Sequence, residues 1–347
     1  MTKSNPGNFF EDFAPGQTIV HATPRTLTEA DAALNIALTG SRYALFCADS
    51  FAQVCGLPGA PLDPLLVFHT VFGKSVADIS LNAVANLGYA EGRFLAPVYP
   101  GDTLSAVSEV LGVKQNSNGK TGVVTVRTTG VNQDDEPVLS YVRWVMVNKR
   151  DAGAACADAP PITPKPFVPA NELQLPPGLD FSHYDWALAG ARHSFGDYEV
   201  GEKIDHVDGM TVEEAEHQLA TRLYQNTAKV HFDALAQASS RFGKRLIYGG
   251  VTISLARALA FNGLANAQLM LAINGGRHVN PLFAGDTLYA WSEVLAKEDL
   301  GAAGALRLRL AAVKNRPAGD FPLKSTAGEY DPSVVLDFDY WAAIPKN

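Results

Sequence analysis

Residues 96–110 read APVYPGDTLSAVSEV and residues 280–294 read NPLFAGDTLYAWSEV, so one pattern occurs twice in this chain. The two copies share a proline, a Gly-Asp-Thr-Leu stretch and a Ser-Glu-Val end, all displaced by 184 positions. A short carboxylate in such a stretch bonds to the N–H groups of a turn. We therefore interpret Asp102 and Asp286 as structural turn residues that precede a strand in each copy.

The repeat extends in both directions from this stretch. Upstream, matching positions recur at a displacement of 185, and downstream a Val-Leu pair and a tryptophan recur at 197 (Val138, Leu139 and Trp144 against Val335, Leu336 and Trp341). The order of the matched blocks is preserved, and small differences in loop length account for the drift. An internal repeat of this kind indicates one supersecondary plan that is used twice.

Proline marks the boundary between the two copies. The chain has 21 prolines, and Pro160, Pro161, Pro164, Pro166, Pro169, Pro176 and Pro177 lie close together. A proline-rich stretch is extended and semi-rigid, and 347 residues are enough for two domains. We expect an N-terminal unit over residues 1–151, a linker over 152–178 and a C-terminal unit over 179–347.

The local patterns predict both strands and helices. Alternation and β-branched residues predict strands at 122–129, 139–147, 306–310 and 334–341, with turns at 132–136 and 316–320. Residues 253–266 are largely apolar, lack proline and predict a buried helix. Each unit should begin with a hairpin-like region, followed by a helix with Thr28 or Thr211 as its N-cap. A helix beside an antiparallel sheet, repeated, is an α+β plan.

Charge and cysteine content exclude several functional classes. The formal net charge is −8, from 28 basic and 36 acidic residues, so no nucleic-acid partner is expected. The three cysteines (Cys47, Cys55 and Cys156) lack metal-site spacing and favour a reducing compartment. Residues 1–13 have no apolar signal-peptide core, and no apolar run is long enough to span a membrane. We expect a cytoplasmic protein without a membrane partner.

Three stretches resemble the MaoC-like (R)-specific enoyl-CoA hydratase family: residues 226–233 (NTAKVHFD), 248–250 (YGG) and 277–288 (RHVNPLFAGDTL). The resemblance implies a tandem double hotdog, in which each copy is an antiparallel sheet wrapped around a central helix. It also implies an acyl-CoA thioester as substrate, with no metal and no redox cofactor. Residues 81–89 and 336–341 are similar to double-hotdog members that interconvert mesaconyl-CoA and β-methylmalyl-CoA by adding or removing water.

The family's catalytic block has an acidic residue five positions before a histidine. The histidine here is His231, and imidazole titrates close enough to neutral pH to move a proton. At the repeat displacement His231 corresponds to Phe46, so we expect only the C-terminal copy to be catalytic, with the N-terminal copy forming pocket walls. Asn226 replaces the acidic residue and corresponds to Ser41. Because a carboxamide does not accept a proton at neutral pH, Asn226 should position water, unless it is only a cap or turn residue.

A second acid or base is not identified by the sequence. His231 either acts alone or works with another group, for which Asp233, Glu214 and the substrate's own carboxylate are candidates. Gly249 and Gly250 should enter the central helix, where their N–H groups stabilise the thioester oxygen or merely permit the turn. The family has a histidine where Gly249 stands, and we interpret His69 as the aligned residue of the first copy.

The distal carboxylate of a mesaconyl group calls for a cation near the acyl end. Lys229 and Arg222 are the preferred candidates, ahead of Arg277 and His278. Asp233 is also taken as a substrate-binding residue.

Other functions remain open from sequence. The alternatives are another enoyl-CoA hydratase, a hotdog thioesterase and a non-catalytic acyl-CoA-binding subunit. Exposed sheet edges favour self-association, so we expect a homo-oligomer, either a dimer or a trimer.

Overall fold

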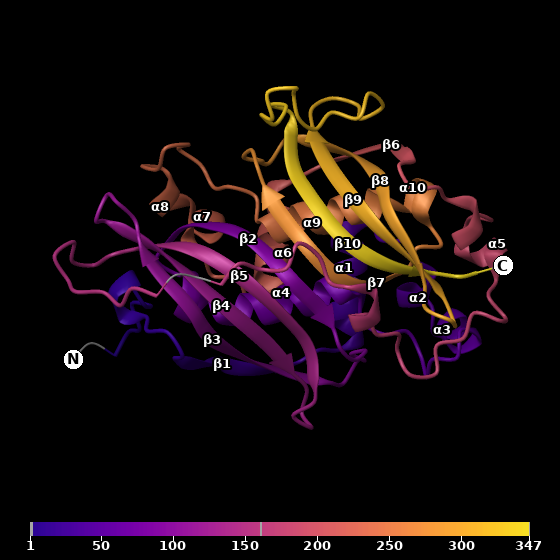
Figure 1. Cartoon of the computed structure of the whole chain (residues 1–347), viewed down its shortest axis with the longest axis horizontal. Coiled ribbons are helices and arrows are strands. Elements are labelled where there is room, and N and C mark those ends of the chain that lie inside the picture. Colours follow the sequence, from indigo (N-terminus) through magenta and orange to yellow (C-terminus); the bar gives the residue numbers. More distant parts are fainter. Residues whose placement is uncertain (1–2, 160–161, 347) are drawn as a thin grey trace.

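The computed structural model describes residues 3–159 and 162–346, so Pro160 and Pro161 of the linker lie outside the described residues. Its main feature is a ten-stranded sheet in the order β1-β3-β4-β5-β2-β7-β10-β9-β8-β6 (Figure 1). Neighbouring strands of this sheet pair antiparallel throughout the described residues. The strands are β1 Thr18–Thr26, β2 Ala83–Phe94, β3 Thr103–Gln115, β4 Thr121–Val131, β5 Pro137–Asn148, β6 Lys203–Thr211, β7 Leu269–His278, β8 Thr287–Asp299, β9 Gly304–Lys314 and β10 Val334–Ile344.

The strand order consists of two equivalent halves that meet at β2 and β7. Reading outward from this joint, each half runs through the same series of strands, β2-β5-β4-β3-β1 on one side and β7-β10-β9-β8-β6 on the other. At the joint, Tyr89 lies opposite Gly276 and Gly92 lies opposite Ile273. A Cβ at Gly92 would lie 2.8 Å from the Cβ of Ile273, so this close pairing needs a glycine.

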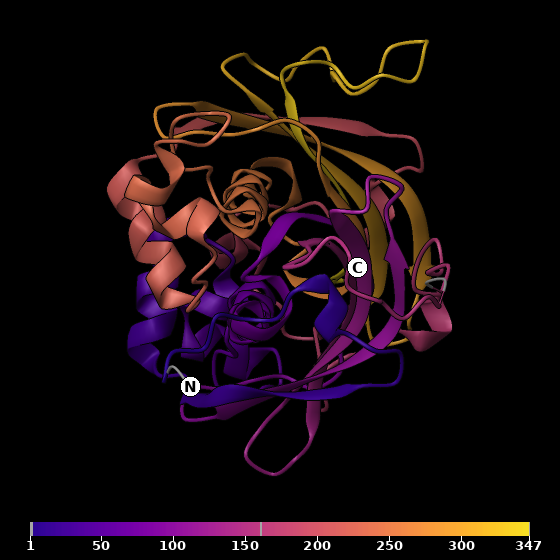
Figure 2. The same ribbon diagram turned by 90° about the vertical axis from the view of Figure 1, so that its left-hand side faces the viewer.

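A central helix lies against each half-sheet. These helices are α4 (Pro64–Ser75) and α9 (Gly249–Leu259), and their residues are buried except for Gly249. Helices that are apolar on all sides belong in a core, and Figure 2 shows the sheet curving around both of them. The expected α+β architecture of a tandem double hotdog is therefore confirmed.

The two central helices touch where the copies meet. The Nε2 atom of His69 lies 2.9 Å from the Oγ atom of Ser254, and these residues are separated by the repeat displacement of 185. Since α4 begins at Pro64 and α9 begins at Gly249, Pro64 is the structural counterpart of Gly249. The alignment of His69 with Gly249 was wrong, because it applied the smaller displacement found near residue 82.

The remaining α-helices have between four and eleven residues. They are α1 Glu29–Thr39, α2 Ala44–Cys47, α3 Asp49–Val54, α5 Trp186–Ala189, α6 Glu214–Leu223, α7 Lys229–Phe232, α8 Ala234–Gln237 and α10 Phe261–Leu264. Helix α10 packs against β6. Helices α2 and α7 occupy equivalent positions in the two copies, since their bounds differ by 185. No helix in the described part of the chain has the length and apolarity needed to cross a membrane.

Three local predictions need correction. Each copy starts with one strand, not a hairpin: β1 pairs with β3, and β6 pairs with β8. Thr28 is the N-cap of α1 as predicted, whereas α6 has Glu213 as its N-cap because Thr211 still belongs to β6. The helix predicted at 253–266 begins earlier, at the Gly-Gly pair, and breaks after Leu259, with non-helical backbone at Asn262 and Gly263.

The linker runs across the sheet instead of hanging free. Ala159 forms a bridge with Val113 of β3, and the Val168 N–H donates to the Asn274 side chain of β7 at 2.8 Å. The indole N–H of Trp341 in β10 donates to the Val168 carbonyl at 3.0 Å. These contacts attach the linker to strands of both halves.

Candidate active site

A cavity of about 600 Å³ lies between the two copies. The N-terminal copy contributes the end of α4, the turn that follows it and β2, while the C-terminal copy contributes α7, the start of α9 and the end of β7. This volume is within the range of small-molecule sites. The lining includes Phe72, Asn86, Tyr89, Asn226, Lys229, His231, Gly249, Thr252 and His278.

His231 presents one ring nitrogen to this cavity. Its Nδ1 atom lies 3.0 Å from the carbonyl oxygen of Leu246, which only accepts, so Nδ1 carries the hydrogen and Nε2 keeps its lone pair. Burial lowers the pKa of His231 to about 4, and the bond to Leu246 opposes this only in part. The imidazole is therefore neutral at pH 7 and can accept a proton at Nε2.

Asn226 is fully buried and lines the same cavity. Its Oδ1 atom accepts from the Ala228 N–H at 3.1 Å, whereas its Nδ2 atom has no hydrogen-bond partner among the described residues. An unpaired buried donor is costly unless a ligand or water meets it. The two interpretations of Asn226, as a turn residue and as a residue that positions water, are therefore compatible. Its oxygen holds the turn before α7, and its nitrogen is available to a ligand.

The start of α9 forms one wall of the cavity. The Tyr248 N–H, at the N-cap, donates to Nε2 of the buried His217 at 2.9 Å, which fixes the entry of the helix. Gly249 lines the cavity, and its N–H lies in the first helical turn, where backbone donors are left free by the helix. Gly250 is buried and does not line the cavity; a Cβ there would meet the rings of Tyr248 and His69. The geometry therefore favours Gly249 over Gly250 for contact with a thioester oxygen.

Of the cations predicted for the distal carboxylate, the structure brings Lys229 and His278 to the cavity, but not Arg222 or Arg277. Lys229 lines it, although this side chain is exposed. Arg222 is exposed on α6 outside the lining, and Asp233 is the N-cap of α8, where it accepts from the Ala236 N–H at 3.0 Å. Glu214 is largely exposed and pairs with Arg245. The expected substrate contacts of Arg222 and Asp233 are thus unsupported, because both side chains have other positions or partners.

Sequence patterns give little or no indication that three polar residues of the lining belong to the site. His278 was ranked below Lys229 and Arg222, and neither Tyr89 nor Asn86 was singled out. A signal for His278 exists in the repeat, since it corresponds to Phe94 at the displacement of 184, just as His231 corresponds to Phe46. No aspartate or glutamate lines the cavity in the described part of the chain.

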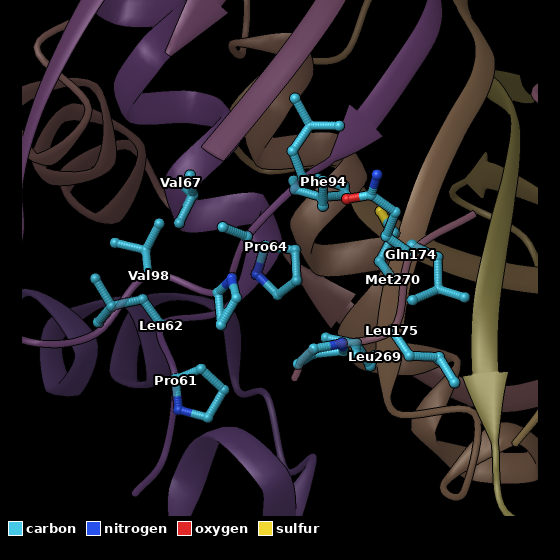
Figure 3. Close-up of a pocket in the computed structure, with 15 residues that line it drawn as sticks. Pro61, Leu62, Pro64, Val67, Phe94, Val98, Gln174, Leu175, Leu269 and Met270 are labelled. Atoms are coloured by element: carbon cyan, nitrogen blue, oxygen red, sulfur yellow. The ribbon is translucent and has the colours of Figure 1, made fainter. Parts of the chain in front are cut away.

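A small apolar pocket of about 40 Å³ occupies the equivalent place in the N-terminal copy. Its lining matches that of the large cavity position by position: Pro61, Leu62, Pro64, Val67 and Phe94 correspond to Leu246, Ile247, Gly249, Thr252 and His278. Figure 3 shows Gln174 and Leu175 of the linker beside these residues. The first copy therefore has the same framework, but apolar residues replace the polar residues of the large cavity. The linker also fills part of the pocket.

Among the described residues, no group of three or more histidine, cysteine, aspartate or glutamate side chains is placed to hold a metal ion. The three cysteines are free, with Cys55 buried and Cys47 exposed. Apart from Lys229, the polar side chains of the cavity are neutral hydrogen-bonding groups and imidazoles, which suit hydrogen bonding and proton transfer.

Comparison with known proteins agrees with this geometry. The family model described as mesaconyl-CoA hydratase matches residues 1–321. The chain is 60% identical to a β-methylmalyl-CoA dehydratase of Chloroflexus aurantiacus, over 99% of both chains. It is also 60% identical to a mesaconyl-CoA hydratase of Cereibacter sphaeroides, over 99% of this chain and 100% of the relative.

A solved structure supports the same assignment. A MaoC domain protein dehydratase from Chloroflexus aurantiacus superposes with a TM-score of 0.97 at 59% identity, and the match covers 100% of both chains. With a family model that spans most of its length and two full-length relatives at this identity, the chain belongs to the mesaconyl-CoA hydratase family.

Proposed function

We propose that this protein catalyses the reversible hydration of mesaconyl-CoA (2-methylfumaryl-CoA) to β-methylmalyl-CoA. The observation that carries the proposal is His231, a neutral imidazole whose free Nε2 faces a cavity with the volume of a small-molecule site. The choice of mesaconyl-CoA as substrate is based on the names of the two full-length relatives.

The first step is the attack of water on the substrate. His231 accepts a proton at Nε2 while the water oxygen bonds to C3, the carbon next to the distal carboxylate. The electron pair of the C2–C3 double bond moves toward the thioester oxygen, and the N–H of Gly249 stabilises the developing negative charge. The Nδ2–H group of Asn226 donates to the water or to the product hydroxyl.

Anionic parts of the substrate need donors at the cavity. Lys229 is the only lysine or arginine among the described lining residues, and we propose that it binds the distal carboxylate or a CoA phosphate. Tyr89 and Asn86 add neutral donors from the N-terminal copy, so that copy contributes to the acyl pocket without carrying the chemistry.

The test is an assay of the purified chain with mesaconyl-CoA. We expect loss of the enoyl-thioester absorbance and formation of β-methylmalyl-CoA, with a rate several orders of magnitude lower in a folded His231→Ala variant. Release of free thiol would indicate a thioesterase, and tight binding without any spectral change would indicate a binding subunit. Either result would contradict the proposal.

We also propose that the enzyme works in the cytoplasm as a homo-oligomer, a dimer or a trimer. The free cysteines support a reducing compartment. The outer strands β1 and β6 support self-association, because each has a sheet neighbour on one side only.

A further inference from the structure

His278, the last residue of β7, is a second imidazole in the cavity. Its side chain is exposed, and the exposed surface faces the cavity. The protein around the cavity still desolvates the ring and lowers its pKa. Its one hydrogen-bond contact within the described residues is with the Tyr89 hydroxyl, and the distance from Nε2 to that oxygen is 3.4 Å. Such a long contact leaves the ring available to a ligand.

Gly249 keeps His278 in this position. A Cβ at residue 249 would lie 2.3 Å from Nε2 of His278 and less than 3 Å from two of its ring carbons. Any other residue at the start of α9 would force the ring away. The start of α9 and the end of β7 therefore fit together only because residue 249 has no side chain.

The N-terminal copy shows what this position contains when no cavity is present. There Phe94 corresponds to His278 and Phe46 to His231, and the pocket shrinks from about 600 to about 40 Å³. A phenyl ring thus satisfies the packing at both positions. The two histidines occur together in the copy that has room for a ligand, which argues for a chemical role over a packing role.

Lys229 of the lining is assigned above to an anionic part of the substrate, and the remaining polar side chains of the cavity are poor second partners for His231. No carboxylate lines it among the described residues, and burial raises the pKa of Tyr89 and of Tyr248. The amide of Asn226 neither gives nor takes a proton at neutral pH. Hydration nevertheless requires that a proton leaves water and that a proton reaches C2.

We propose that His278 is a catalytic residue that carries the proton from His231 to C2 of the substrate. His231 takes the proton from water as the C3–O bond forms and the C2–C3 π pair becomes the enolate. The proton passes through the cavity from His231 to His278. His278 then delivers it to C2 as the enolate collapses, and both imidazoles return to neutral. Dehydration follows the same path in reverse.

The electrostatics of the site support this relay. Burial and, second, the nearby His231 lower the pKa of His278 to about 4. The titratable groups that interact with it are Tyr89 of β2, through the contact described above, and His231 of α7 and His69 of α4, through their charges. An imidazolium formed in such a site is a strong acid, so it gives up its proton to the enolate carbon readily.

The experiment compares His278→Ala and His278→Phe with His183→Asn, an exposed histidine outside the cavity. Phenylalanine is the residue that the N-terminal copy uses here, so His278→Phe should fold. We expect kcat for mesaconyl-CoA hydration to fall by about 10²–10⁴-fold in both His278 variants, with little change in KM. Free imidazole should restore part of the activity of His278→Ala, while His183→Asn should match the wild type.

The inference rests on the proposed function, and the two fail in different ways. If the wild-type enzyme does not hydrate mesaconyl-CoA, the proposed function fails. If the wild type is active and either folded His278 variant keeps its kcat, the relay is overturned while the function stands. A higher KM at unchanged kcat overturns it equally, since His278 would then only bind substrate.

Discussion

The reactivity of His231 depends on which ring nitrogen carries the hydrogen. The Leu246 carbonyl holds Nδ1–H at 3.0 Å, and this leaves Nε2 as the base. Sequence similarity and the repeat pointed to His231 and Asn226, because both lie in one short block. His278 lies far from that block in sequence, and the matching stretch 277–288 suggests it only as a cation for the distal carboxylate. Its replacement by Phe94 in the first copy was a readable signal for a further role.

The lowered pKa of His231 predicts an unusual pH profile. Because burial lowers the pKa to about 4, the base form is present above that pH and is lost as the pH falls through it. We expect kcat/KM for mesaconyl-CoA to be flat near neutral pH and to fall on an acid limb near pH 4 to 5. An acid limb close to the ordinary histidine value of about 6.5 would contradict the described environment.

The first turn of α9 and the end of β7 act as one unit. The Tyr248 N–H at the N-cap donates to His217. Gly249 has no side chain, and this leaves room for the ring of His278 beside the helix start. Parts of β4, β5 and β10 could be predicted from β-branched and aromatic residues, and part of β9 from its alternation. The family resemblance predicts the Gly-Gly pair at the entry of the central helix, and α9 does begin there. Local propensity does not predict this start, because glycine is a poor helix former. The contacts with His217 and His278 could not be predicted, because these partners lie far away in sequence.

This unit predicts a severe effect of one added methyl group. We expect Gly249→Ala to displace the His278 ring and to lower kcat by roughly 10- to 100-fold, since a shift of about 1 Å in a catalytic group has this order of effect. The matched control is Gly275→Ala in β7, the strand that carries His278. A Cβ at residue 275 would lie 3.7 Å from its nearest atom, which is an ordinary contact distance. Equal activity of the two variants would show that the fit at Gly249 is unimportant.

At the scale of the whole molecule, the two copies have the same framework but differ in their pockets. The two halves share strand order and central helices, yet of the two equivalent pockets the one in the C-terminal copy is large and polar and the other is small and apolar. The repeat made the double architecture predictable. The path of the linker, with Val168 bound between Asn274 and Trp341, could not be predicted, because these partners are far away in sequence.

Buried histidines make the fold sensitive to acid. Desolvation lowers the pKa of His69 and His217 to about 3 and that of His206 to about 4. Below pH 6.5 the unfolded chain binds protons that the native state does not, so stability falls as the pH falls toward these values. Asp63 acts oppositely between about pH 6 and 4, because burial raises its pKa to about 6.

These three histidines outweigh this one carboxylate, and His231 and His278 of the cavity act in the same direction as the three. Each group changes the free energy of unfolding by about 1.4 kcal/mol per pH unit within its window, so the net loss is on the order of 3 kcal/mol per unit near pH 5. We expect the Tm, measured by differential scanning calorimetry, to fall by several degrees between pH 7 and pH 5. A constant or higher Tm at pH 5 would mean that the histidines are not held neutral by burial.

The central claim is that catalysis takes place in the cavity of the C-terminal copy, at His231. A crystal structure with 2-methylsuccinyl-CoA, the saturated analogue that cannot be hydrated, tests it most directly. The account predicts the acyl group in the large cavity, with C3 facing Nε2 of His231 and the thioester oxygen near the Gly249 N–H. An acyl group in the pocket beside Phe94, or outside both pockets, would contradict it.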